Sequence, residues 1–142
     1  MAFNELSRQS DISAYVYSTN TAADLKTPVM DMLNYESVLF IGAKSVTNAS
    51  AYMYMRMSTA SASAGMTHAT GDQPLSRTTI FLDVQRPIKR YVQGVLKAAT
   101  TTGSFAIIQA IKYNAKVQPT THSNVSTTGS RLYSPGSGTA TG

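Results

Sequence analysis

The residues that most often carry enzyme chemistry are few in this chain and stand far apart. The two histidines, His68 and His122, lie in polar stretches, and neither has a second ligand at metal-binding spacing. Asp72 follows His68 by four residues and serines are frequent, yet nothing resembles the strand–turn–helix that presents a nucleophilic serine. The sequence therefore predicts neither a metal site nor a serine hydrolase.

The acidic residues do not suggest a catalytic pair either. Glu36 and Asp83 both fall on expected strands, but hydrolases with paired carboxylates usually have more acids and an aromatic cleft. This chain has seven acids, eight tyrosines, four phenylalanines and no tryptophan. Its glycine-rich end, SPGSGTATG, lacks the lysine and the following helix of a phosphate-binding loop. We therefore expect no enzyme, no catalytic residue and no cofactor.

Composition narrows the class of protein further. The 142 residues suit a single domain, and only 13% of them are charged, because serine, threonine, alanine and glycine fill the surface. There is no cysteine, so no disulfide framework is expected. The first residues contain no apolar signal segment, and no apolar run approaches the ~18 residues of a membrane span. We expect a soluble protein made in a cytoplasm, without a membrane partner.

Charge is distributed unevenly along the chain. Residues 1–84 hold five Lys/Arg and all seven Asp/Glu, whereas residues 85–142 hold seven Lys/Arg and no acid, so the two parts carry −2 and +7. This asymmetry is typical of docking to an acidic partner or of self-complementary contact, and also of a solvated basic face. The basic residues are spaced along strands and no nucleic-acid-binding motif is present. No direct contact with nucleic acid is therefore expected.

The apolar pattern predicts strands in most of the chain. Residues 78–115 organise it, since three segments with period-two alternation follow one another, separated by Arg86-Pro87 and by residues 100–103. Residues 12–19 form another alternating segment. Residues 35–44 contain the continuous apolar run VLFI, which indicates a strand covered on both faces.

The intervening segments differ in kind. Residues 52–57, YMYMRM, place three methionines on one face, which we expect to fill the core; an adaptable contact surface for another subunit is the alternative. Residues 20–34 contain Pro28 and indicate a connection or an extended surface segment. Residues 58–77 are small, polar and rich in turn formers, and we expect a protruding loop.

These elements predict an all-β fold. Sequential strands with short turns favour an antiparallel β-sandwich over a closed barrel, and a jelly-roll-like arrangement is one form of it. The expected organisation is an extended N-terminal arm at residues 1–10, the sandwich at residues 11–116, and a Ser/Thr/Gly/Pro-rich C-terminal arm at residues 117–142. In that tail, Leu132 and Tyr133 are candidate anchors.

The stretch RPIKRY, from Arg86 to Tyr91, is the most distinctive local feature. It gathers Arg86, Lys89 and Arg90 around a proline at a break between two strands. Two interpretations remain open. The cations could pair with acids of a partner, or they could guard an edge strand against aggregation.

The order of segments from Tyr35 to the C-terminus resembles that of small virion proteins of tailed bacteriophages. A YESVLFIGA strand, a polar loop, FLDVQRPIKRYVQGVL, the strand AIIQAIKYNA and a Ser/Pro/Gly-rich tail follow one another. This pattern is similar to head decoration (cement) proteins. The resemblance implies a homotrimer on the outer capsid surface of the virion, where it binds the major capsid protein. The contact regions implied are Met1–Ser10, the cations Arg86, Lys89 and Arg90, and the anchors Leu132 and Tyr133.

Two other virion roles stay open beside this one. A head–tail connector or tail component would form rings and would not follow the capsid lattice. A carbohydrate- or receptor-binding sandwich displayed on the virion would present aromatic rings and carboxylates together. The exposed candidates here are Tyr52 and Tyr54, which stand near Arg56.

Overall fold

The computed structural model describes residues 10–18, 24–45, 51–74, 77–97 and 105–116. These residues form strands and no helix, so the described part contains no helix able to cross a membrane. The strands are β1 (Asp11–Ser18), β2 (Leu25–Lys26), β3 (Met30–Asp31), β4 (Tyr35–Lys44), β5 (Tyr52–Ser58), β6 (Thr67–His68), β7 (Gln73–Pro74), β8 (Thr79–Gln85), β9 (Tyr91–Lys97) and β10 (Ala106–Ala115).

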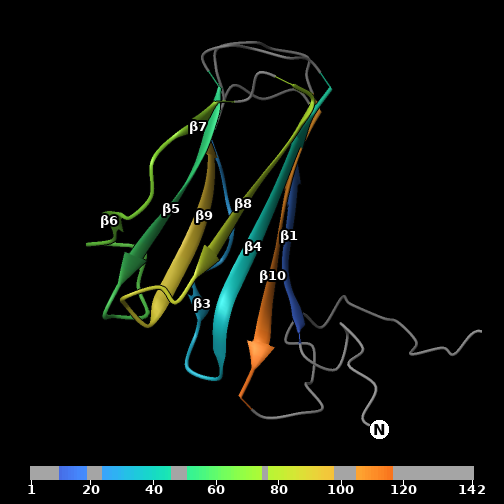
Figure 1. Cartoon of the computed structure of the whole chain (residues 1–142). Helices are drawn as coiled ribbons and strands as arrows, with labels where there is room; N and C mark the ends of the chain where they lie inside the picture. Colours follow the sequence, from blue (N-terminus) through green and yellow to red (C-terminus); the bar gives the residue numbers. More distant parts are fainter. Residues whose placement is uncertain (1–9, 19–23, 46–50, 75–76, 98–104, 117–142) are drawn as a thin grey trace, which may run out of the picture.

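Two antiparallel sheets pack face to face, which confirms the predicted all-β sandwich (Figure 1). Sheet A has the order β1-β10-β4-β8. Sheet B has the order β2-β9-β5-β6, with β3 also on β9 and β7 also on β5. If β2 with β3, and β6 with β7, are each counted as one interrupted strand, the described part of the chain has eight strands. Renumbered in chain order, these eight give the order 1-8-3-6 in sheet A and 2-7-4-5 in sheet B. That is the strand order of a jelly roll.

The core lies between the inner faces of the two sheets. Met53 and Met55 are 0% and 1% exposed, so the prediction that the methionine face fills the core is confirmed. Phe40 of β4 is also fully buried, and its ring lies over Gly94 of β9. A Cβ at Gly94 would stand only 2.4 Å from Cδ1 of that ring, so glycine is what lets the two sheets approach here.

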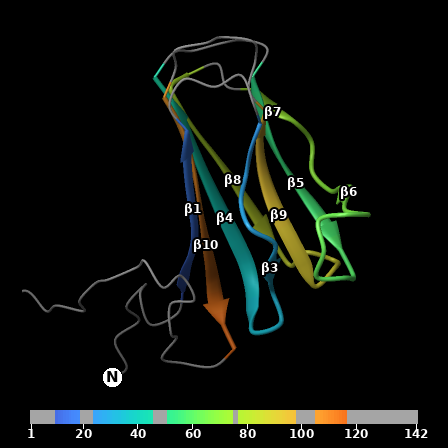
Figure 2. The same cartoon turned by 180° about the vertical axis from the view of Figure 1, so that it is seen from behind.

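Residues 24–32 are extended, as one of the two interpretations of this segment predicted, but β2 and β3 within them belong to sheet B and reach into the core. Leu25 and Met30 are buried there, and β2 and β3 run along β9 (Figure 2). The break between them falls at Pro28. Thr27 bridges it, since its N–H donates to the Gly94 carbonyl at 3.0 Å and its Oγ1 accepts from the Gly94 N–H at 3.0 Å. A side-chain hydroxyl thus replaces a main-chain carbonyl where the ladder is interrupted.

The prediction of a protruding loop at residues 58–77 is only partly right. Residues 59–65 are exposed, but β6 and β7 return along the edge of β5 and pair with it. The Ala69 N–H donates to the Met55 carbonyl at 2.9 Å, and the Met55 N–H donates to Thr70 Oγ1 at 2.9 Å. Strands of two residues, such as β6 and β7, are too short to show the period-two alternation in the sequence. The predicted arms lie outside the described residues, apart from Ser10, which is buried.

Candidate functional site

The RPIKRY stretch lies at one end of the sandwich, in the connection from β8 of sheet A to β9 of sheet B (lower end of Figure 1). The turn between β3 and β4 crosses the same end. The Arg86 N–H donates to the Glu36 carbonyl at 2.7 Å, and the Met32 N–H donates to the Arg90 carbonyl at 2.8 Å. Arg86 has a φ of 50°, a left-handed conformation that costs a non-glycine residue about 1 kcal/mol or more. The two hydrogen bonds hold this connection in place.

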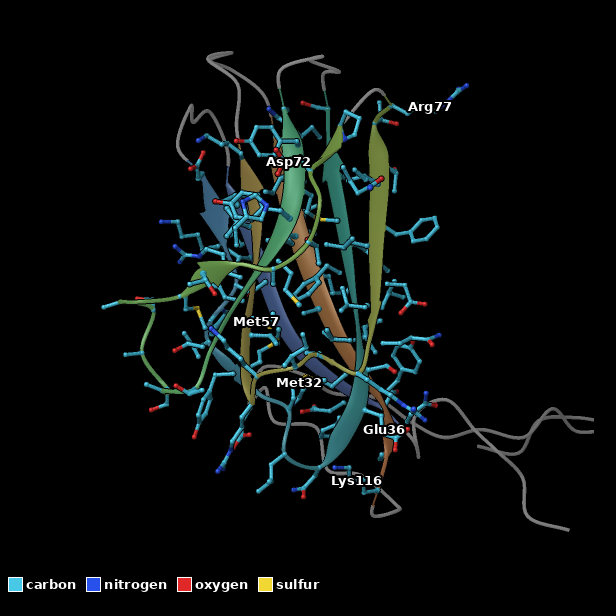
Figure 3. The ribbon with its side chains drawn as sticks, turned by 60° about the vertical axis from the view of Figure 1, so that its left-hand side comes forward. Met32, Glu36, Met57, Asp72, Arg77 and Lys116 are labelled. Atoms are coloured by element: carbon cyan, nitrogen blue, oxygen red, sulfur yellow. The ribbon has the colours of Figure 1, made fainter. Side chains whose placement is uncertain are left out.

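An open cavity of about 390 Å³ lies between these segments, and we call it the end hollow. Ile88 is 89% exposed and Leu33 is 53% exposed at its rim. Figure 3 shows Glu36 and Lys116 at this end of the molecule. The lining residues are Met32, Leu33, Tyr35, Glu36, Lys116 and residues 86–90.

Arg90 is neutralised within the chain. Its Nε donates to Asp31 Oδ1 at 2.8 Å and a terminal nitrogen donates to Oδ2 at 2.7 Å, which is a bidentate pair. The hydrogen bond from Arg90 is the largest cause that holds the pKa of Asp31 below its usual range. Arg90 therefore ties β9 to β3, and its charge is already compensated.

The other cations of the end hollow keep their charge available. Lys89 Nζ donates to the neutral hydroxyl of Thr67 at 3.2 Å. Lys116 Nζ donates to the Leu33 carbonyl at 3.3 Å, and Arg86 is exposed and has no ion pair within the described part. Three positive charges thus surround two exposed apolar side chains, and Glu36 is the one acid among the lining residues.

A buried ion pair lies near the same end. Lys112 of β10 places its Nζ 3.2 Å from Asp11 Oδ2 of β1, with side chains 9% and 1% exposed. The same ammonium donates to the Asp31 carbonyl at 3.2 Å and stands 4.6 Å from the centre of the Tyr35 ring. This pair joins the first strand to the last, and it is structural because partners from solution cannot reach it.

The structure brings together the three basic residues that the sequence singled out, but it gives them different surroundings. Arg86 and Lys89 line the end hollow with free charge, whereas Arg90 pairs with Asp31. Leu132 and Tyr133, like residues 1–9, lie outside the described residues. Sequence reasoning missed Leu33, Ile88 and Lys116, which are drawn together only by the fold. The exposure of Ile88 could have been predicted from the sequence, since an isoleucine in a turn between cations is unlike a residue that packs in a core.

A separate aromatic group lies on sheet B. The Tyr54 ring stacks on His68 with centroids 4.1 Å apart, and Lys97 Nζ stands 5.7 Å from the centre of the Tyr52 ring. Arg56 donates to the Gln93 side chain. Each ring already has one face against another side chain. In the part of the chain that the structure describes, no three possible metal ligands come together.

Both ends of the described domain leave from the end that carries the hollow. Asp11, at the start of β1, pairs in register with Lys112 near the end of β10, and Lys116 itself lines the hollow. The segments 1–9 and 117–142 therefore attach beside it. A scan against protein-family models and a search of curated proteins gave no match for this chain.

Proposed function

We propose that the protein is a phage decoration protein and that the end hollow is the surface with which it docks on the capsid. One observation carries the proposal. Free cations and exposed apolar side chains gather at the same end of the sandwich from which both terminal segments leave. An isoleucine as exposed as Ile88 is suited to contact, and the surrounding cations favour a partner surface that presents carboxylates.

The physical logic is one of linkage. A protein that binds only the assembled lattice stabilises that lattice by mass action, and many identical sites make weak contacts effective. A homotrimer would present three end hollows at once. The jelly roll suits such a role because viral capsid domains use it, but lectin domains use it as well. The end hollow, and not the fold, therefore supports the proposed role.

A ring-forming connector is the main alternative, and imaging of its symmetry would reveal it. A carbohydrate-binding role finds less support. One face of the Tyr52 ring lies against Lys97 and one face of the Tyr54 ring against His68, which reduces the aromatic surface left for a sugar.

The test is co-sedimentation of the purified protein with capsid shells of the phage that encodes it. The variant Arg86→Glu/Lys89→Glu reverses two cations of the end hollow. We expect its occupancy on the shells to require roughly tenfold more protein, because exposed charge pairs contribute about 0.2–1 kcal/mol each and reversal adds repulsion.

The matched control is Lys26→Glu, which reverses an exposed cation on β2, opposite Val95 and outside the end hollow. It should bind like the original chain. Equal binding by the control and the double variant would remove the end hollow as the docking surface. Recovery of the protein only in tail fractions of disrupted virions would remove the decoration role itself.

A further inference from the structure

Strand β8 forms an open edge of sheet A. It pairs with β4 on one side, and it is the last strand in the order of the sheet. The Lys44 N–H donates to the Thr78 carbonyl at 2.9 Å, and the Arg86 N–H donates to the Glu36 carbonyl at 2.7 Å. Main-chain groups alternate along an antiparallel strand, so the even-numbered residues of β8 turn theirs toward β4. The odd-numbered residues turn theirs outward, where no described strand pairs with them.

The other sheet edges are protected in ways that β8 is not. The β5 edge is covered by β6 and β7, the edge formed by β2 and β3 is broken at Pro28, and β1 carries an irregularity between Ile12 and Ala14. Natural proteins commonly use such devices to prevent edge-to-edge pairing. Within β8, TIFLDVQ, there is no lysine, arginine or proline, and its register with β4 is continuous.

The side chains of β8 also expose apolar surface at this edge. Phe81 is 70% exposed, and Ile80 and Leu82 are only half-buried although they pack against the core. A cavity of about 500 Å³ opens beside the strand, between β7 and β8. Its lining residues are Gln73, Pro74, Arg77 and residues 79–83.

We propose that β8 pairs antiparallel with β8 of a second copy of this chain, so that two copies of sheet A join across a two-fold axis. The pairing is centred on Ile80. It sets Arg77 opposite Asp83 of the second copy, and Thr79 opposite Phe81, twice by symmetry. Odd-numbered residues then oppose odd-numbered residues, so the outward main-chain groups within the paired stretch find partners.

Charge complementarity selects both the partner and the register. Arg77 has no ion pair within the described part of the chain, and Figure 3 shows its side chain projecting away from the body at the start of β8. The Tyr113 hydroxyl donates to Asp83 Oδ1, and no residue in the described part of the chain pairs with Oδ2. Centring the pair on Phe81 would set Asp83 opposite Thr79, and centring it on Leu82 would set Asp83 opposite Phe81. Among these three registers, the one centred on Ile80 places opposite charges face to face, an arrangement that stabilises cross-strand pairs.

The contact does not depend on the proposed function. It uses residues 77–83, whereas the end hollow is lined by residues 86–90 beyond the end of β8. A two-fold contact also differs from the contact that would close a trimer, so trimers linked through β8 would give hexamers. Whether β8 joins two single chains or two trimers, the expected number of subunits is therefore even.

The test is the mass of the full chain by sedimentation equilibrium over a range of concentrations. We expect a dimer or a hexamer for the original chain. Arg77→Asp should raise the dissociation constant of the two-fold contact about tenfold or more, because two attractive pairs become repulsive. Phe81→Lys, which adds the missing edge lysine, should weaken the contact as well.

The charge swap Arg77→Asp/Asp83→Arg should restore association, since the pair is rebuilt with its signs exchanged. Asp83→Arg also removes the hydrogen bond from Tyr113, so Tyr113→Phe serves as the control that loses this bond and keeps the edge charges. A monomer or a trimer at the highest soluble concentration would overturn the proposal. So would an Arg77→Asp variant, folded by circular dichroism, that associates like the original chain.

Discussion

Gly94 is the position where one added methyl group tests the packing of the two sheets. A Cβ placed there would stand 2.4 Å from Cδ1 and 2.6 Å from Cε1 of Phe40, well inside contact distance. Phe40 is fully buried, so its ring cannot swing into solvent. Gly94→Ala must therefore push the ring into the surrounding core or force the two sheets apart.

The expected magnitude follows from two opposing effects. Overpacking a core typically costs about 1–3 kcal/mol. Replacing glycine with alanine restricts the unfolded chain and returns about 0.4–1 kcal/mol. The net loss should be about 1–2 kcal/mol of unfolding free energy, which corresponds to roughly 3–10 °C in Tm for a domain of this size.

Urea unfolding followed by far-UV circular dichroism measures this loss, and a second substitution tests its cause. Phe40→Leu alone should cost about 1–2 kcal/mol through lost burial. In the double variant Phe40→Leu/Gly94→Ala, the smaller Leu should leave room for the new methyl. Its loss of unfolding free energy should therefore be about 1 kcal/mol smaller than the sum of the two single losses. Gly71→Ala, where a Cβ would meet nothing within 4 Å, is the control and should stay within about 0.5 kcal/mol. A neutral Gly94→Ala or fully additive losses would refute this reasoning.

Two further predictions concern ion pairs. Lys112→Met should lower the free energy of unfolding in urea by about 3–5 kcal/mol, because it leaves the carboxylate of Asp11 buried without its cation. The double variant Asp11→Leu/Lys112→Met should lose less than the sum of the two single variants. Additive losses would argue against the ion pair. The pKa of Asp31 is lowered chiefly by the hydrogen bond from Arg90, so its contribution should be present above the unfolded value of about 3.9 and be lost as the pH falls through the lower folded value. Asp31→Asn should flatten this acid dependence and cost under about 1 kcal/mol at pH 7, since the side chains of Arg90 and Asp31 are 46% and 41% exposed to screening solvent. An unchanged acid profile would contradict the assignment.

Local pattern was enough to predict most strands but not their partners. The strand predicted at residues 35–44 is β4 with the same bounds, and the methionine face of β5 points into the core as expected. Period-two alternation reports burial on each face, and that is a local property. The sheet to which a strand belongs depends on pairing between distant residues. The sequence therefore did not reveal that β8 and β9, neighbours in the chain, lie in different sheets.

The candidate site was only partly predictable for the same reason. Arg86 and Lys89 stand together in the sequence, so their grouping needed no fold. Leu33 and Lys116 join them from turns and strand ends far away in the chain. The neutralisation of Arg90 by Asp31 likewise spans 59 residues. Charged residues can be counted from the sequence, but which of them are neutralised by an ion pair can be seen only in the structure.

The pairing of β1 with β10 has a consequence for synthesis on the ribosome. Strand β1 cannot pair until β10, the last strand, has been synthesised, because Ile12 pairs with Ile111 and Ser18 with Ala106. Strands β2 and β3 likewise cannot pair until β9 has been synthesised. Contacts this distant in the chain form slowly, and a nascent chain lacking residues 106–115 has no central strand to hold β1 and β4 together. The protein should therefore fold only after nearly all of it has been made, and truncation before β10 should yield aggregate and no smaller domain.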